Sequence, residues 1–349
     1  MFAFIRHSKI WFTLSSIAVG LSLAVFAIFG LNFGIDFTGG SLLELQFQQT
    51  VTPEQIAETL STSELDLGEP IITPADSGAF LIRVRYLEED ERTQLDSTLG
   101  KSLGSFETLR FTTTGPTLGK SLRERAVRAI IYASIAIVMY LAAVFRNTRR
   151  DSLTKYVSIG SILGFGTIIA ETMVEDDFTR WMLFLAIVAL FLVFMVLEIR
   201  KNSPSLKYGV CAIVALVHDI TITLGVLVIL GQFFGVEINS LTVTALLTIL
   251  GFSVHDTIVV FDRMRENRKF QTASESLSMV ADKSLNQTLT RSINTSFSTL
   301  IVLAILFWLG AESIKWFVFT LLCGVVVGTY SSIFTATPLL VYWENRNRR

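Results

Sequence analysis

The sequence has little charge and few cysteines, histidines and prolines. Charged residues make up only 17% of the 349 residues, whereas soluble domains carry about 25%, so an ordinary soluble enzyme is excluded. The net charge of −1 argues against a nucleic-acid-binding protein, which would carry a basic excess. Both cysteines, Cys211 and Cys323, lie within apolar runs, so neither a disulfide framework nor a cysteine-based metal site is indicated.

Apolar residues are abundant instead. They make up 51% of the chain, and the mean hydropathy is +0.56. A helix needs about 20 apolar residues to cross a bilayer, so the long apolar runs predict an integral membrane protein with eight spans. The predicted spans are Ile10–Leu31, Ala129–Phe145, Tyr156–Val174, Trp181–Leu197, Tyr208–Val236, Ile238–Phe261, Ser292–Ala311 and Trp316–Trp343.

Lysine and arginine collect in the loops on one side of these spans. The basic clusters are Arg146–Lys155, Arg200–Lys207, Arg263–Lys269 and Arg346–Arg349. The loops on the other side carry Glu171, Glu175, Asp176, Asp177, Glu237 and Glu312. Because basic loops stay in the cytoplasm, this bias predicts a multi-pass protein with both termini cytoplasmic.

One polar segment, between the first two spans, does not belong to the membrane. Its alternating and helical patterns predict the element order β-α-β-β-α-β, which is that of a ferredoxin-like α+β domain outside the cytoplasm. The predicted elements are strand Ser41–Gln48, a helix from Thr52 to Leu60, strands Glu69–Thr73 and Ala79–Tyr86, helix Glu88–Leu103 and strand Phe106–Thr113.

Ionisable residues within the spans are expensive and indicate function. Asp219 lies 11 residues into the fifth span, about 17 Å along a helix. Asp256 lies 6 residues before Asp262, so it lies about 9 Å inside the cytoplasmic edge of the sixth span. Arg291 begins the seventh span, and Asn294 lies one turn further in. If the sixth and seventh spans pack together, Asp256 and Arg291 meet at similar depth. Such a pair could carry protons, or it could simply hold the helices together.

Two histidines each precede an aspartate, as His218 before Asp219 and His255 before Asp256. Adjacent positions on a helix point about 100° apart, and a zinc site would want a third protein ligand. The third histidine, His7, is near the N-terminus. The sequence therefore predicts neither a metal site nor a cofactor.

Several segments, in order along most of the chain, resemble the SecD/SecF family of protein-export subunits, and its SecF branch in particular. The matching segments are Phe33–Gly40, Gly115–Ser121, Ala245–Arg263, Ser284–Ser292 and Gly324–Ser332. The first of these holds the family signature residues Gly34, Asp36, Gly39 and Gly40.

The resemblance implies a fold and a function. The fold would be half of an RND-type transporter with the ferredoxin-like domain outside. The SecF branch pairs with SecD, and the two use the proton-motive force to assist export through SecY, SecE and SecG across the bacterial cytoplasmic membrane. The relay aspartate of the family maps onto Asp256 and its partner arginine onto Arg291, with Asp219, His255 and Asn294 nearby. The implied contacts are with the translocating polypeptide and membrane lipids rather than nucleic acid.

The chain departs from the family pattern in two respects. His255 stands where relatives usually have asparagine, and residues from about 147 to 203 add two spans to the usual six. The predicted segments are a first transmembrane helix at 1–32, the extracytoplasmic domain at 33–125, a second transmembrane helix at 126–146, the inserted hairpin at 147–206, the core helices at 207–343 with a cytoplasmic amphipathic segment on the membrane surface at about 263–290, and a basic tail at 344–349.

A stand-alone RND-like exporter of lipid or small molecules is the alternative function. Such a pump would carry both repeat halves, whereas this chain has one. An intramembrane enzyme is a third class, but no Ser/His pair, catalytic pair of aspartates or metal constellation supports it. The sequence therefore favours a proton-coupled export subunit that is not an enzyme.

Overall fold

The computed structural model describes residues 2–63, 65–75, 78–145, 153–174, 176–200, 204–272 and 274–346. The chain divides into two compact units. The helical unit comprises the described residues of Met1–Phe29, Arg128–Val226 and Thr244–Arg349. The α/β unit comprises those of Gly30–Val127 and Leu227–Val243. The end of helix α8 and the start of helix α9, with the loop between them, thus belong to the α/β unit.

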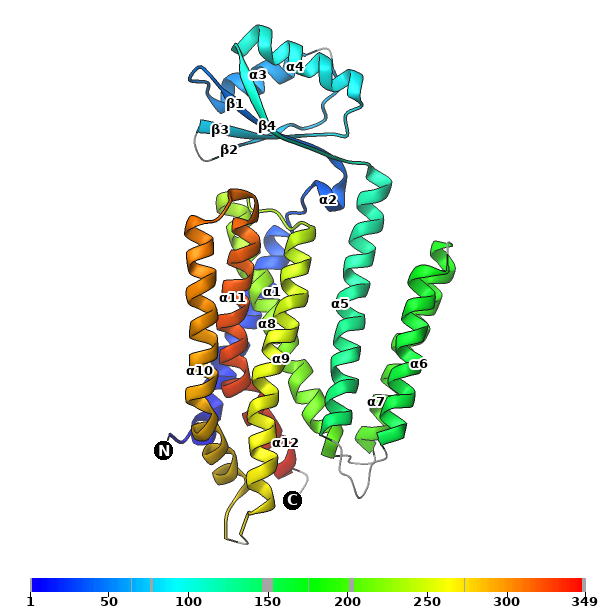
Figure 1. Ribbon diagram of the computed structural model, residues 1–349, viewed down its shortest axis with the longest axis vertical. Coiled ribbons are helices and arrows are strands. Elements are labelled where there is room, and N and C mark those ends of the chain that lie inside the picture. Colours follow the sequence, from blue (N-terminus) through cyan, green and yellow to red (C-terminus); the bar gives the residue numbers. More distant parts are fainter. Residues whose placement is uncertain are drawn as a thin grey trace. The chain divides into compact units, whose positions relative to one another are not determined.

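The α/β unit has the predicted ferredoxin-like order, which the structure confirms. Its elements are α2 (Ile35–Thr38), β1 (Gly40–Phe47), α3 (Pro53–Ser61), β2 (Ile71–Pro74), β3 (Ala79–Val84), α4 (Glu89–Leu103) and β4 (Phe106–Thr114). The four strands form an antiparallel sheet in the order β2-β3-β1-β4. Helices α3 and α4 lie together on one face of this sheet (Figure 1).

Local sequence explains these elements. Thr52 caps α3 through a capping box with Gln55, and Pro53 occupies the first turn, where its missing N–H costs nothing. In β1 every second side chain is buried, because successive residues of a strand face opposite sides of the sheet. The buried side chains form a core between the sheet and the two helices, which includes Leu43, Leu45, Ile56, Ile82, Leu95 and Leu99.

Helices make up the other unit. They are η1 (Ile5–His7), α1 (Ser8–Phe29), α5 (Pro116–Val144), α6 (Leu153–Thr172), α7 (Asp177–Arg200), α8 (Pro204–Phe234), α9 (Ser240–Lys269), α10 (Leu277–Leu309), η3 (Glu312–Ile314), α11 (Lys315–Ser331), η4 (Ser332–Ala336) and α12 (Thr337–Arg346). Within the described residues, seven helical segments are long and apolar enough to span a membrane. The eighth predicted span falls on α6, whose apolar part counts as the shorter helix Ile159–Ile168.

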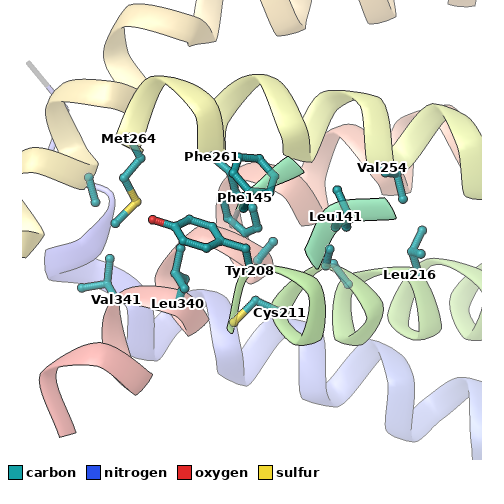
Figure 2. Packing of buried hydrophobic residues seen from close by; sticks show 14 of the residues in the cluster. Leu141, Phe145, Tyr208, Cys211, Leu216, Val254, Phe261, Met264, Leu340 and Val341 are labelled. Carbon is teal, nitrogen blue, oxygen red and sulfur yellow. The ribbon is translucent and has the colours of Figure 1, made fainter. Parts of the chain in front are cut away.

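The core of the helical unit lies where five of these helices meet. Figure 2 shows side chains from α5, α8, α9 and the last span packed around the ring of Tyr208. Phe145 stacks on Tyr208 with ring centroids 4.9 Å apart, and Phe261 meets Tyr208 edge-on at 5.2 Å. The cluster is completed by α10 through Leu277 and Ala281.

Helices α6 and α7, which the sequence predicts to form a hairpin, pack against α5. Leu163 of α6 and Phe191 and Phe194 of α7 form a second cluster with Val138 and Ala142 of α5. Most of the predicted basic loop Arg146–Lys155 lies outside the described residues, as do residues 201–203 and 347–349.

The predicted surface helix in the segment 263–290 is different in the structure. The stretch from Leu277 onward is the first part of α10 and is continuous with the seventh span. Its apolar side chains Leu277, Val280 and Leu285 are buried against other helices. The apolar stripe that the sequence shows is present on this helix, but it packs against other helices of the protein and not against lipid. An apolar stripe alone does not specify which apolar surface it contacts.

Candidate functional site

Asp219 of α8 is the most buried carboxylate of the spans that the structure describes, with 1% of its surface exposed. Its Oδ2 accepts hydrogen bonds from Ser253 Oγ at 2.6 Å and from Ser331 Oγ at 2.8 Å. Its Oδ1 lies 2.9 Å from Nδ1 of His218. A buried charge costs several kcal/mol unless hydrogen bonds compensate it, so these three neighbours are what allow a carboxylate here.

Asp256 of α9 is 7% exposed. Its Oδ2 accepts a hydrogen bond from Ser332 Oγ at 2.6 Å. The donors to Asp219 and Asp256 therefore include two consecutive residues of the last span, Ser331 and Ser332. Consecutive side chains on a helix point about 100° apart, which allows one turn of the last span to hold carboxylates of two different helices.

The last span changes its winding at these serines. Ser331 is the final residue of α11, and Ser332 begins η4, a single π-helical turn that ends at Ala336. Thr337 Oγ1 donates to the carbonyl oxygen of Ser332 at 2.9 Å. Such turns are rare and occur mostly at functional sites.

A polar chain leads from Asp219 to the first span. The imidazole of His218 stacks on the ring of Tyr330, with centroids 6.0 Å apart. The hydroxyl of Tyr330 lies 3.2 Å from Ser15 Oγ, which lies 3.1 Å from Thr335 Oγ1. Hydroxyl groups can both donate and accept, so the hydroxyls of Tyr330, Ser15 and Thr335 form one hydrogen-bonded group, which His218 contacts by ring stacking and not by a hydrogen bond.

The other predicted residues of the relay lie apart from the two carboxylates. His255 and Asn294 are exposed on α9 and α10. Arg291 is also exposed and lines a cavity of about 370 Å³ with Asp262 and Gln287, together with Ile258, Val259, Arg263, Glu266 and Thr288. Asp256 and Arg291 form no ion pair in this conformation. Equal depth on two helices brings side chains together only if both helices turn those faces toward each other, and Asp256 faces the last span instead.

The sequence patterns do not single out the hydroxyl residues that contact the two aspartates, nor Tyr330. Hydroxyl groups are common in membrane helices because they can bond to carbonyls of their own helix, so Ser253, Ser331 and Ser332 stand out only once the packing is known. For Tyr330, Ser331 and Ser332, the sequence signal is that they lie in the segment Gly324–Ser332, which resembles the family.

The signature residues form a separate site in the α/β unit. Asp36 Oδ2 accepts a hydrogen bond from the backbone N–H of Ser240 at 2.9 Å. Gly39 has a φ of 75°, and a Cβ there would lie 2.7 Å from Cα of Pro116. Gly40 has a φ of 131°. Positive φ and a close backbone approach both require glycine.

Two family models match this chain. The model described as protein export membrane protein SecD/SecF, C-terminal, matches residues 95–152 and 166–346. The SecD/SecF GG motif model matches residues 24–51, which include the signature residues.

Full-length relatives and a solved structure agree with these models. Protein translocase subunit SecF of Thermobaculum terrenum is 34% identical over 99% of this chain and 95% of its own. The SecF subunit of Desulfurispirillum indicum is 35% identical over 98% of this chain and 92% of its own. The crystal structure of a Thermus SecDF, a translocon-associated membrane protein, aligns with a TM-score of 0.70 at 27% identity; the alignment covers 99% of this chain but 39% of that longer one.

The fold, the order of the matched segments and the full-length similarity lead to one family. The chain is a multi-pass membrane protein with a role in Sec protein export, and it belongs to the SecD/SecF protein-export family, on the side of the SecF subunits.

Proposed function

We propose that the chain is a SecF-type subunit that pairs with SecD and uses the proton-motive force to assist export through SecY, SecE and SecG. It would act as a transport component and carry out no catalytic reaction of its own. The observation that carries this proposal is the pair of buried carboxylates, Asp219 and Asp256, each held by one of two consecutive serines. Intramembrane carboxylates that face the bundle interior are the usual elements of proton relays.

Coupling would come from a change in the surroundings of Asp256. Near the guanidinium of Arg291 the carboxylate favours its ionised form, whereas burial apart from a cation favours the protonated form. In this conformation Arg291 lines the cavity and Asp256 is bound to Ser332. A rearrangement that brings Arg291 to Asp256 would therefore release a proton, and the reverse movement would take one up.

SecD is the proposed partner because this chain corresponds to 39% of the length of the Thermus SecDF chain. A proton-coupled transporter with two repeats forms its site at their interface. A stand-alone exporter of lipid or small molecules would have to supply the second half by pairing with its own copy.

Recovery of the partners tests this proposal. The tagged full-length chain, extracted gently from the native membrane, should bring down SecD in near-equal amount, and SecY, SecE and SecG in part. Recovery of the chain only with further copies of itself would contradict the proposal and favour the stand-alone exporter.

The proposed orientation puts the basic loops and both termini in the cytoplasm and the α/β domain outside. The charge bias of the loops supports it. Reporter fusions provide the test: a reporter after Gly78 should be active only outside the cytoplasm, and one after Lys269 only inside. The opposite pattern would reverse the topology and place the α/β domain in the cytoplasm.

A further inference from the structure

The signature segment is bound to the loop that joins the two aspartate-bearing helices. In this contact, which we call the docking joint, residues 32–36 lie along residues 236–240. Gly34 N–H donates to the carbonyl oxygen of Ile238 at 2.9 Å, and Ile238 N–H donates to that of Asn32 at 2.8 Å. The carboxylate of Asp36 accepts from Ser240 N–H. Ser240 is the first residue of α9, so Asp36 occupies a helix N-terminus, where backbone N–H groups lack partners and negative charge is favoured.

An ion pair closes the docking joint from the side of the sheet. Arg83 of β3 places Nη1 2.8 Å from Glu237 Oε1 and 3.0 Å from the carbonyl oxygen of Phe33. Glu237 lies directly over Gly34, where an added Cβ would be 2.9 Å from Glu237 Oε2. The signature glycine thus makes room for the carboxylate that Arg83 holds. Both side chains are mostly buried, with 16% and 27% exposed, so the pair is shielded from water.

Both helices that leave this joint lead to a candidate proton site. Asp219 lies 15 residues before Phe234, the last residue of α8, which is about 22 Å along a helix. Asp256 lies 16 residues after Ser240 on α9, about 24 Å. A hydrogen-bonded helix transmits displacement along its axis, so movement at either aspartate reaches the α8–α9 loop.

We propose that Glu237 and Asp36 are positioning residues for protein export. They fasten the α/β domain to the α8–α9 loop, so that movement of the helices is passed to that domain. This role rests on the proposed function, because the helix movement that the docking joint transmits is the movement that protons would drive. It assigns a mechanical role to the signature segment, whose Gly34 and Asp36 form the contact.

The charges at the joint make it sensitive to pH. Burial raises the pKa of Glu237 above its ordinary value, the Arg83 guanidinium lowers it, and the Asp36 carboxylate raises it. Since the docked state has the raised pKa, protonation favours docking, and docking weakens as the pH rises through that pKa. Arg83 is what allows the joint to stay closed when Glu237 is ionised.

The joint can be tested in the full-length chain with spin labels at Gln94→Cys and Phe233→Cys, in a Cys211→Ala/Cys323→Ala background. Gln94 is exposed on α4 and Phe233 is exposed at the end of α8, so the distance between labels reports on docking. The parent should give one narrow distribution. Arg83→Gln leaves the Glu237 charge unpaired, so at about pH 8 the distribution should widen at least twofold. It should narrow again at about pH 4, which is below the ordinary pKa of a glutamate, because Glu237 with its raised pKa is protonated there.

Two further variants distinguish the loss of docking from a general loss of structure in the α/β domain. Arg83→Gln/Glu237→Gln removes both charges and should stay narrow at both pH values. Arg85→Gln breaks a different ion pair of the same domain, with Glu91, and should change nothing. A narrow distribution for Arg83→Gln at about pH 8 would overturn the docking role of the ion pair.

Export measurements with and without a proton gradient test the mechanical role. Arg83→Gln should lose gradient-dependent stimulation, and the double variant Arg83→Gln/Glu237→Gln should regain it. If the joint of Arg83→Gln opens while stimulation stays at the parent level, the positioning role is wrong. If the parent itself shows no gradient-dependent stimulation, the proposed function fails, and with it the role of the joint in export.

Discussion

Asp256→Asn is expected to abolish the gradient-dependent stimulation of export while leaving the protein folded and inserted. Asparagine is nearly isosteric with aspartate, and its Oδ1 can still accept the hydrogen bond from Ser332. It cannot bind and release a proton, so a relay that requires ionisation stops. The measurement compares export into inside-out vesicles with and without an imposed proton gradient, with the variant paired to wild-type SecD.

Graded variants show whether the loss comes from proton handling. Ser332→Ala removes the donor to Asp256 but keeps the carboxylate, so stimulation should fall only in part. Arg291→Lys should also be partial, because the charge remains while the fork geometry of the guanidinium is lost. Glu312→Gln changes an exposed carboxylate and should have no effect. Full gradient-dependent stimulation in Asp256→Asn would make that residue structural and end the proposed relay.

Gly225→Leu is expected to destabilise the protein strongly. Helices α1 and α8 approach each other at this residue: an added Cβ would lie 2.9 Å from Cα of Ser22, and closer still to the Ser22 side chain. Overpacking of this kind costs about 1–3 kcal/mol, and here it presses on backbone that cannot rotate away. Membrane helices rely on small residues for such close contacts.

The thermal melting temperature of the detergent-solubilised protein measures this effect. Gly20→Leu is the matched control, because Gly20 lies on α1 and has no atom within 4 Å of an added Cβ. The control should melt near the parent, and Gly225→Leu should melt clearly lower. Equal melting temperatures for the two variants would show that α1 is not packed against α8 at Gly225.

Much of the fold was predictable because each element follows a local rule. The α/β domain was found with strand and helix ends within about two residues, since alternation, capping at Thr52 and turn residues are written in consecutive positions. The spans were predictable from run length. The seventh span lies where the sequence predicts it. The polar residues from Leu277 onward predict a separate surface helix instead of an extension of this span, because they interrupt the apolar run without ending the helix.

The candidate site was predictable only in part. Asp219 and Asp256 stand out as carboxylates in apolar runs, and the structure buries both. The meeting of Asp256 with Arg291 does not occur in this conformation. The hydroxyl donors Ser331 and Ser332 and the docking of Asp36 at Ser240 appear only in the folded protein.

The sequence by itself determined the membrane class, the position of each buried carboxylate along its span and the element order of the α/β domain, because these depend on the spacing of residues along one element. Only the tertiary structure decided which face of each helix meets which neighbour. The rotation of each helix about its own axis depends on the fit of side chains from several helices at once. Examples are the close approach at Gly225 and the packing around Tyr208. The tertiary structure therefore decided that Asp256 meets a serine of the last span while Arg291 lines a cavity between α9 and α10.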